Sequence, residues 1–321
     1  MSSEHPATAG HPATAGVGGA RPLVMGVLNV TPDSFSDAGR YFDRDRAVER
    51  GLAMVAEGAD LIDVGGESSR PGARPVSAAE ELRRVVPVLE ALAGRVRLSV
   101  DTVKAEVAEA ALAAGATLLN DISGSLWPLA AEAGAGWVAM HMRGTPATMQ
   151  HDPRYDDVVD EVRRRLRQLT DTARNAGVPE VWVDPGIGFA KTAAHNLSLL
   201  RHLDALVADG APVLVGTSRK GFLGTVGPGV DGRPAPVGER TPASLATAVW
   251  SMLSGAAMVR VHDVAATVAA ATLVGGQRGP AVGAPCSGGR RDVGGPGAAG
   301  PGRGVPPLPA TAVGRGPRGR R

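Results

Sequence analysis

The sequence has one cysteine, few aromatic residues and no long apolar run. Cys286 is the single cysteine, so no disulfide can form within the chain, and the fold needs no oxidising compartment. Aromatic residues make up only 3% of the chain. No apolar run approaches the roughly 20 residues that span a bilayer, and the first residues lack the basic and apolar segments of a secretory signal. We therefore expect a cytoplasmic protein without a membrane partner.

The excess of basic charge is confined to the C-terminal segment. The formal net charge is +2, but residues 275–321 contain eight arginines and one acidic residue and carry +7, which leaves −5 for residues 1–274. A nucleic-acid-binding domain carries its basic surface on the fold itself, so we expect no nucleic-acid partner. An anionic partner for the basic segment stays open, although a tail without a role is the simpler interpretation.

Both ends of the chain lack the composition of a folded domain. Residues 1–20 contain a direct HPATAG repeat, and residues 275–321 hold 15 Gly and 8 Pro among 47 residues. Such segments bury too little apolar surface to offset the entropy that is lost on ordering. We predict disordered tails at 1–20 and 275–321 around one folded domain, residues 21–274, whose length suits one α/β barrel of roughly 250 residues.

Short apolar runs alternate with helix-period segments inside this domain. Strands buried on both faces read as continuous apolar runs, and eight such runs are present: Leu23–Leu28, Leu61–Val64, Arg97–Val100, Thr117–Leu119, Trp137–Met140, Val181–Val183, Pro212–Val215 and Met258–Val261. Eight strands, most of them followed by a helix, predict an α/β fold of the (β/α)8 TIM barrel type. An open doubly wound sheet is the alternative, but it normally has a glycine-rich turn after the first strand, where this chain has Asn29-Val30-Thr31-Pro32.

The helical segments have typical starts and apolar stripes. Ser77 and Glu80 have the spacing of a capping box, and Thr241-Pro242 is a typical first turn. The charged segment Tyr155–Asn175 is expected to form an outer, solvent-facing helix. In the first helical segment we expect one buried face made by Val48, Leu52, Val55 and Ala56.

Polar residues follow nearly every apolar run. The active sites of barrels lie at the carboxyl ends of the strands, and in this chain those positions hold Asn29, Gly65–Arg70, Asp101, Asn120, His141, Asp184, Ser218–Lys220, Arg260 and His262. A single Asp or Asn after a strand is usually a helix cap or a turn residue, but this set would converge on one rim. The acids and the amide suit a flat heterocycle rich in N–H groups, and the cations suit a polyphosphate. We therefore predict a ligand with an amidine-like ring at one end and an anion at the other.

Eight segments resemble, in order, the signature motifs of dihydropteroate synthases. The resemblance covers about Pro22 to Val274 and rests on Met25–Asp37, Asp63–Gly72, Ser99–Thr102, Asn120–Gly124, Met140–Gly144, Asp184–Phe189, Gly216–Lys220 and Val259–Asp263. It implies a homodimer that uses Mg2+ as cofactor. The implied reaction joins 4-aminobenzoate to (7,8-dihydropterin-6-yl)methyl diphosphate and releases diphosphate, as a step of folate biosynthesis.

The resemblance also implies a role for each matched position. The pterin would be bound by Asp101, Asn120, Met140, Asp184, Phe189 and Lys220. The diphosphate would be bound by Asn29, Ser69, Arg260 and His262, and Asn29 would also hold Mg2+. The 4-aminobenzoate site would comprise Phe35, Arg70, Pro71, Phe189, Ser218 and Lys220. The catalytic residues would be Asp101, Lys220, Arg260 and His262, and the loops Val30–Arg40 and Gly66–Pro75 would close over the substrates.

Two alternatives remain within the same type of barrel. A pterin-binding methyltransferase would share the acid and amide floor but would have no use for Phe35 or Ser218-Arg219-Lys220. An inactive paralogue would bind a pterin or a partner without turnover, and the presence of Asn29, Lys220 and His262 argues against it.

Overall fold

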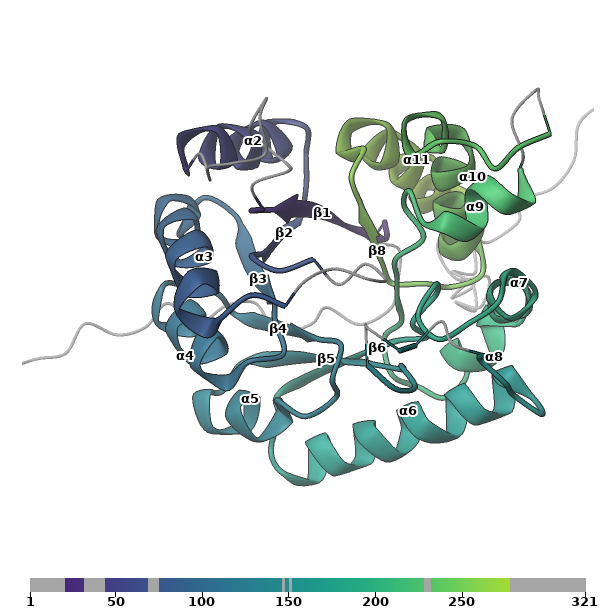
Figure 1. The fold of residues 1–321 in the computed structure, drawn as a ribbon, viewed down its shortest axis with the longest axis horizontal. Coiled ribbons are helices and arrows are strands. Elements are labelled where there is room, and N and C mark those ends of the chain that lie inside the picture. Colours follow the sequence, from purple (N-terminus) through teal and green to yellow (C-terminus); the bar gives the residue numbers. More distant parts are fainter. Residues whose placement is uncertain are drawn as a thin grey trace, which may run out of the picture. The chain divides into compact units, whose positions relative to one another are not determined.

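The computed structural model describes residues 21–31, 44–68, 75–145, 148–149, 152–227 and 232–277. Within these residues eight strands alternate with helices (Figure 1). Each of the eight predicted apolar runs overlaps one strand. The strands are β1 (Leu23–Asn29), β2 (Leu61–Gly65), β3 (Arg97–Asp101), β4 (Leu118–Asp121), β5 (Gly136–Met140), β6 (Glu180–Asp184), β7 (Leu214–Val215) and β8 (Met258–Val261).

The strands form one parallel sheet that closes on itself. Their order is β6-β5-β4-β3-β2-β1-β8-β7, with every neighbouring pair parallel. The two end strands meet through a parallel bridge between Val183 and Val213, where the N–H of Val183 donates to the carbonyl of Pro212 at 3.0 Å. The predicted TIM barrel is therefore confirmed, and the open sheet is excluded.

Helices surround the barrel on its outer side (Figure 1). They are α2 (Arg44–Ala56), α3 (Ala78–Leu92), α4 (Ala105–Ala113), α5 (Trp127–Ala133), α6 (Val158–Asn175), α7 (Ala193–Arg201), α8 (Leu203–Val207), α9 (Gly221–Val226), α10 (Thr241–Leu253) and α11 (Val264–Gln277), with a 3-10 turn at Val237–Glu239. The helix α10 begins at Thr241 as predicted, and the charged segment forms α6. The part of the chain that the structure describes has no helix with both the length and the apolar character needed to cross a bilayer.

Two local predictions need correction. Ser77 caps α3 by accepting the N–H of Glu80 at 3.3 Å, but the Glu80 carboxylate binds Arg83 and Arg84 instead of returning to the cap. In α2 the predicted stripe is only half right. Val48 and Val55 pack against the core, but Leu52 and Ala56 are exposed. The fully buried residues of this helix are Ala47, Gly51 and Met54. Gly51 explains the difference, because a side chain there would collide with Leu92.

The inward-facing residues alternate along the strands and divide the barrel interior into layers. A small apolar core fills the middle of the barrel, separate from the large core between strands and helices, and consists of Met25, Leu61, Leu118, Val138, Trp182, Leu214 and Met258. Successive strand residues point to opposite sides, so residues two positions further along each strand face inward again. Those positions hold Val27, Asp63, Asn120, Met140, Asp184, Gly216 and Arg260. The polar residues near the carboxyl ends of the strands thus lie directly above the small apolar core inside the barrel.

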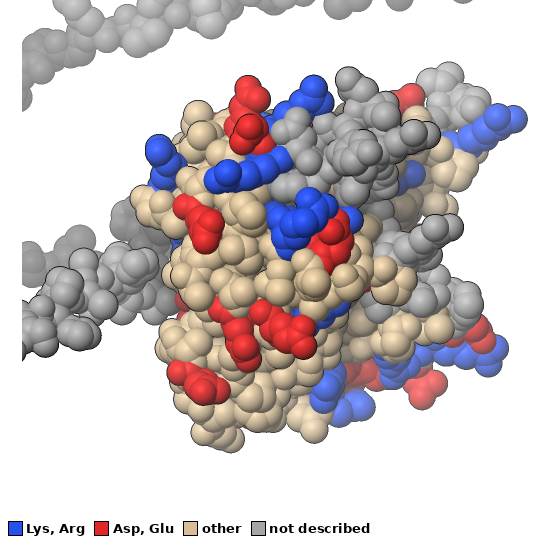
Figure 2. Space-filling model, turned by 60° about the vertical axis from the view of Figure 1, so that its left-hand side comes forward, with Lys and Arg blue, Asp and Glu red and all other residues tan. Residues whose placement is uncertain are grey.

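The outer surface beside α3 and α4 carries no single sign of charge. On the face shown in Figure 2, Lys and Arg side chains are interspersed with Asp and Glu, and uncharged surface lies between them. This mixture agrees with the slightly acidic body expected from the sequence.

Candidate active site

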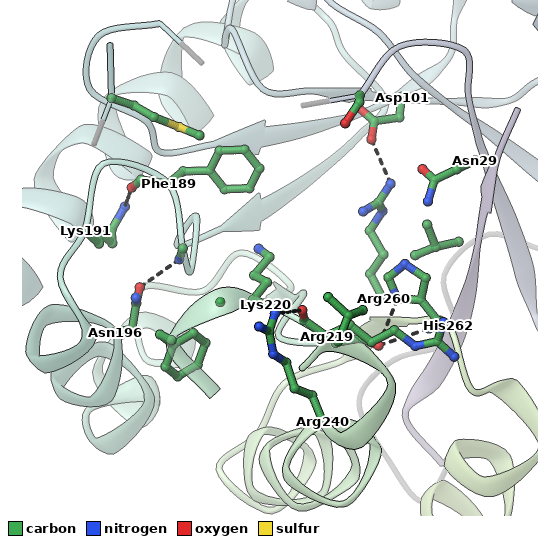
Figure 3. A pocket seen from close by; sticks show the side chains of 18 of the residues that line it. Asn29, Asp101, Phe189, Lys191, Asn196, Arg219, Lys220, Arg240, Arg260 and His262 are labelled. Atoms are coloured by element: carbon green, nitrogen blue, oxygen red, sulfur yellow. Dashed lines mark hydrogen bonds and ion pairs between the residues drawn. The ribbon is translucent and has the colours of Figure 1, made fainter. Parts of the chain in front are cut away.

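One large cavity lies at the carboxyl ends of the strands. Its volume is about 970 Å3, and seven of the predicted site residues line it: Asn29, Asp101, Phe189, Ser218, Lys220, Arg260 and His262. Asn29, Arg260 and His262 lie on one side of the cavity, Phe189 lies on the other, and Lys220 lies between them (Figure 3). The predicted convergence of strand-end residues on one rim is therefore present in the structure.

Arg260 connects β8 with an acid in the middle of β2 and another at the end of β3. Its Nε donates to Asp63 at 2.6 Å. Its Nη2 donates to Asp101 at 2.7 Å (Figure 3). The same Oδ2 of Asp63 accepts a bond of 2.8 Å from the amide of Asn120. Nη1 of Arg260 makes no hydrogen bond within the described residues, so it is the nitrogen that can meet an anion in the cavity.

Asp63 is a site residue that the sequence analysis missed. It is fully buried and bonded to two predicted site residues, Asn120 and Arg260. Its position indicates this role, because Asp63 lies two residues after the inward-facing Leu61 and begins the Asp63–Gly72 motif. A polar residue in the middle of a buried strand needs a buried partner, and that argument would have identified it.

Burial shifts the proton affinities of the groups around the cavity. Burial raises the pKa of Asp101 to about 7, against the opposing effect of Arg260 and with a further contribution from Asp63. Burial also raises the pKa of Asp184, which Lys220 partly offsets. The pKa of Lys220 is lowered to about 8 by burial, although Asp184 acts in the opposite direction. Asp101 and Lys220 thus change charge nearer to neutral pH than their unperturbed counterparts do.

Lys220 and Phe189 form the part of the cavity opposite Asn29. The ammonium of Lys220 lies 4.7 Å from the centre of the Phe189 ring and donates to the carbonyl of Ile187. An ammonium over an aromatic face is favourable because the ring face is electronegative. The pair presents an apolar ring and a donor side by side, which suits an aromatic ligand with a polar substituent.

Ser218 and His262 are bonded to each other at the rim. The Ser218 hydroxyl lies 2.9 Å from Nδ1 of His262 and accepts the backbone N–H of His262 at 3.2 Å. The hydroxyl hydrogen can then be donated to Nδ1, which leaves the ring proton on Nε2. The structure therefore gives Ser218 an orienting contact with His262 besides its predicted place beside 4-aminobenzoate.

Three predicted pterin residues lie deeper than the lining of the cavity. Asn120, Met140 and Asp184 are buried at the ends of β4, β5 and β6, with Met140 and Asp184 paired in register. Oδ1 of Asp184 accepts the N–H of Gly186 at 2.7 Å, which fixes the carboxylate beneath the following loop. Four other predicted residues, Phe35, Ser69, Arg70 and Pro71, lie outside the described residues, as does most of the two predicted closing loops.

Comparisons with known proteins give the family. Residues 25–262 match the family model described as pterin binding enzyme. A dihydropteroate synthase of Mycobacterium leprae (strain TN) is 51% identical over 261 residues, which are 78% of this chain and 92% of that protein.

Solved structures agree in fold. The Xanthomonas albilineans dihydropteroate synthase with 4-aminobenzoic acid has a TM-score of 0.74 and 44% identity, covering 81% of this chain and 94% of that chain. The Xanthomonas albilineans enzyme in complex with 7,8-dihydropteroate has a TM-score of 0.71 and 42% identity, with coverages of 81% and 94%. The chain therefore belongs to the dihydropteroate synthase family of pterin-binding enzymes.

Proposed function

We propose that this transferase joins 4-aminobenzoate to (7,8-dihydropterin-6-yl)methyl diphosphate, with release of diphosphate, in folate biosynthesis. One observation carries the proposal: a single cavity combines buried carboxylates, an aromatic wall, and cations around one rim. The relatives from Xanthomonas albilineans, in which 4-aminobenzoic acid and 7,8-dihydropteroate are bound, support the same choice of substrate and product.

The reaction breaks a carbon–oxygen bond and forms a carbon–nitrogen bond. Diphosphate leaves the pterin methylene with the bonding electron pair, and the amine of 4-aminobenzoate attacks that carbon and then loses a proton. Asp101 and Asp184 would stabilise positive charge on the pterin ring, and Arg260 and His262 would stabilise negative charge on the leaving diphosphate. No protein nucleophile is required, so the chain acts by holding both substrates in line.

Mg2+ is the cofactor that we propose for the diphosphate. No group of three His, Cys, Asp or Glu that could hold a metal ion exists in the described part of the chain. Asn29 lines the cavity near Arg260 and His262, and its side chain makes no hydrogen bond to any described residue. Mg2+ is often bound by one or two protein oxygens together with substrate phosphates and water, so a single amide oxygen fits. When bound, the ion would neutralise charge on the leaving diphosphate.

A homodimer is also proposed, and an exposed apolar strip supports it. Trp250 and Leu253 on α10 are 54% and 63% exposed, and Leu197 on the adjacent α7 is 42% exposed. The indole of Trp250 bonds the Leu200 carbonyl at 2.9 Å, so the two helices present one continuous surface. Leu253→Glu should shift the protein from dimer to monomer in light scattering. The cytoplasm remains the proposed location, because a chain with a single cysteine needs no oxidising compartment.

The proposed reaction is tested by supplying both substrates with Mg2+ and measuring 7,8-dihydropteroate and diphosphate in equal amounts. Oxygen-18 placed between the methylene carbon and the adjacent phosphorus of the substrate must appear in the released diphosphate, because the carbon–oxygen bond breaks. A chain that binds the pterin without forming product would be an inactive paralogue, and methyl transfer from a folate would indicate the methyltransferase alternative. Asn29→Ala should weaken the dependence on Mg2+, and an unchanged dependence would remove Asn29 from the metal site.

A further inference from the structure

In the loop that follows β6, five consecutive residues, 186–190, are each bonded by a side chain. Two side chains accept backbone N–H groups: Asp184 accepts from Gly186 at 2.7 Å, and Asn196 accepts from Gly188 at 2.8 Å. Three side chains donate to backbone carbonyls: Lys220 to Ile187, Lys191 to Phe189 at 3.0 Å, and Tyr155 to Ala190 at 3.0 Å. Loops of this length are usually held by turns and caps, so an anchor at each residue indicates that the position of this loop matters.

Strain in the backbone points to the same loop. Ala190 has a φ of 50°, which L-residues other than Gly, Asn and Asp rarely adopt. Strained residues persist only where the surroundings fix them, and they gather at functional sites. The hydroxyl of Tyr155 holds the Ala190 carbonyl, and Lys191 holds the carbonyl just before it.

Lys191 is the most unusual of these anchors. The residue is 3% exposed, and its Nζ lies 3.0 Å from Nδ1 of His141 and 3.3 Å from the carbonyl of His141. Nζ also donates to the carbonyl of Phe189 at 3.0 Å (Figure 3). It makes no ion pair with any residue that the structure describes. An ammonium has three donors, and three acceptors meet them here. The Lys191 ammonium therefore links the end of β5 to the loop after β6 that contains Phe189.

The protonation of its neighbour is consistent with this arrangement. Burial, followed by the charge of Lys191, lowers the pKa of His141 to about 3, so the ring is neutral and Nδ1 can accept a hydrogen bond. Burial lowers the pKa of Lys191 to about 7, while Asp184 raises it and Lys220 and Arg143 lower it further. The chain thus keeps a costly buried amine where an apolar residue would fill the space.

Lysine is rare in this chain. The sequence contains only three lysines, Lys104, Lys191 and Lys220, and the other 31 basic residues are arginines. Lysine and arginine are not interchangeable at buried sites, because the guanidinium is a larger planar fork.

We propose that Lys191 is a positioning residue for 4-aminobenzoate, because it fixes the backbone of Phe189 and so the aromatic wall of that subsite. The proposal rests on the proposed function. Lys191 also lies at the wall of the cavity, but its donors are directed to His141 and to the Phe189 carbonyl, so it acts on the substrate through the placement of that ring. Phe189 is also a predicted pterin residue, but the pterin side of the cavity is held in addition by Asp63, Asn120 and Arg260 through separate bonds. It should therefore be affected less than the 4-aminobenzoate side.

The first experiment replaces Lys191 by Met, which has similar length and no donors. In steady-state assays with both substrates and Mg2+, the KM for 4-aminobenzoate should rise about tenfold, since a misplaced contact affects binding strongly. The KM for the pterin diphosphate should stay within about threefold. Unchanged KM values, or an equal rise in both, would overturn the proposal. A wild-type chain that forms no dihydropteroate would instead refute the proposed function.

Chemical rescue separates positioning from simple space filling. Lys191→Cys in a Cys286→Ser background is alkylated in urea with 2-bromoethylamine, which rebuilds an amine of lysine length, and is then refolded. The matched control is alkylation with 1-iodopropane, which adds the same number of heavy atoms without the amine. Wild-type chain is carried through the same cycle. The amine should restore the KM for 4-aminobenzoate to within about threefold of wild type, and the propyl group should not. Equal recovery with both adducts would show that only volume matters and would overturn the proposal.

A second variant keeps the proposal testable if the Lys191 variants do not fold. Tyr155→Phe removes only the hydroxyl that anchors Ala190, on a half-buried ring. It should raise the KM for 4-aminobenzoate by about threefold, in line with the loss of one hydrogen bond, and leave the KM for the pterin diphosphate unchanged. No change in either KM would contradict a role for anchoring of this loop.

Discussion

Arg260 at the end of β8 donates a hydrogen bond of 2.7 Å to Asp101 at the end of β3. Together with the 2.6 Å bond to Asp63, this contact joins β8 to two strands on the other side of β1. The two carboxylates hold the guanidinium at the floor of the cavity before any substrate binds. Preorganisation of this kind lowers the cost of arranging charges during the reaction, and it gives a direct way to test the site.

Asp63→Ala should lower kcat/KM for the pterin diphosphate by about 100-fold, because misplaced site residues have effects of that size. The variant removes Oδ2, the oxygen that accepts hydrogen bonds from both Asn120 and Arg260. Steady-state kinetics measure the effect, with circular dichroism as the control for folding. A loss smaller than about threefold would mean that Arg260 is positioned without Asp63.

The dependence of kcat/KM on pH should be bell-shaped and narrow. The pKa of Asp101 is about 7, so activity should rise with pH as this carboxylate ionises. The pKa of Lys220 is about 8, so activity should fall above that value as the ammonium loses its proton. Measurement from pH 5.5 to 9.5, a range of about four units chosen to span both limbs, checks the profile. Asp101→Asn should remove the acidic limb, and a limb that persists in this variant would assign it to another group.

Ser218→Ala should weaken binding of the pterin diphosphate without affecting the fold. The variant loses the 2.9 Å contact with Nδ1 of His262, which is one of the bonds that orient the ring and favour one tautomer. We expect the dissociation constant for the pterin diphosphate to rise about threefold to tenfold, the usual cost of one hydrogen bond. Calorimetric titration provides the value, and unchanged affinity would show that His262 needs no support from Ser218.

Asp121→Ala should lower the stability of the fold and leave the binding of both substrates unchanged. Asp121 follows Asn120 on β4 but points away from the cavity, where it accepts the N–H groups of Ser125 and Leu126 at 2.8 and 2.7 Å and the indole of Trp137 at 3.2 Å. Loss of these bonds should lower the free energy of unfolding by about 3 kcal/mol. Denaturant unfolding measures this, and both KM values should remain those of wild type. A raised KM would place Asp121 in the site after all.

The barrel could be predicted because its signals are local. Eight continuous apolar runs and the helix starts at Ser77 and Thr241 are visible along the chain, and the structure confirms them. The buried face of α2 could not be predicted in the same way. Gly51 was not counted as apolar contact surface, yet its missing side chain is what lets α2 approach Leu92.

The candidate site could be predicted only in part. The position of Asn29, Asp101, Lys220 and Arg260 around one cavity follows from their places at strand ends, since all such ends meet at one rim. Their partners within the site do not follow from the sequence. The bond from Arg260 to Asp63 joins residues 197 positions apart, and Lys191 reaches His141 across two different loops. Such contacts depend on the closed barrel rather than on local spacing.

The most direct test is a crystal structure of the chain with a pterin and 4-aminobenzoate bound. The pterin ring should lie within hydrogen-bond distance, about 3.2 Å or less, of Asp101, Asn120, Asp184 and Lys220. The 4-aminobenzoate should lie against the ring of Phe189. Pterin bound away from these four residues, or the two ligands bound in separate cavities, would contradict the account.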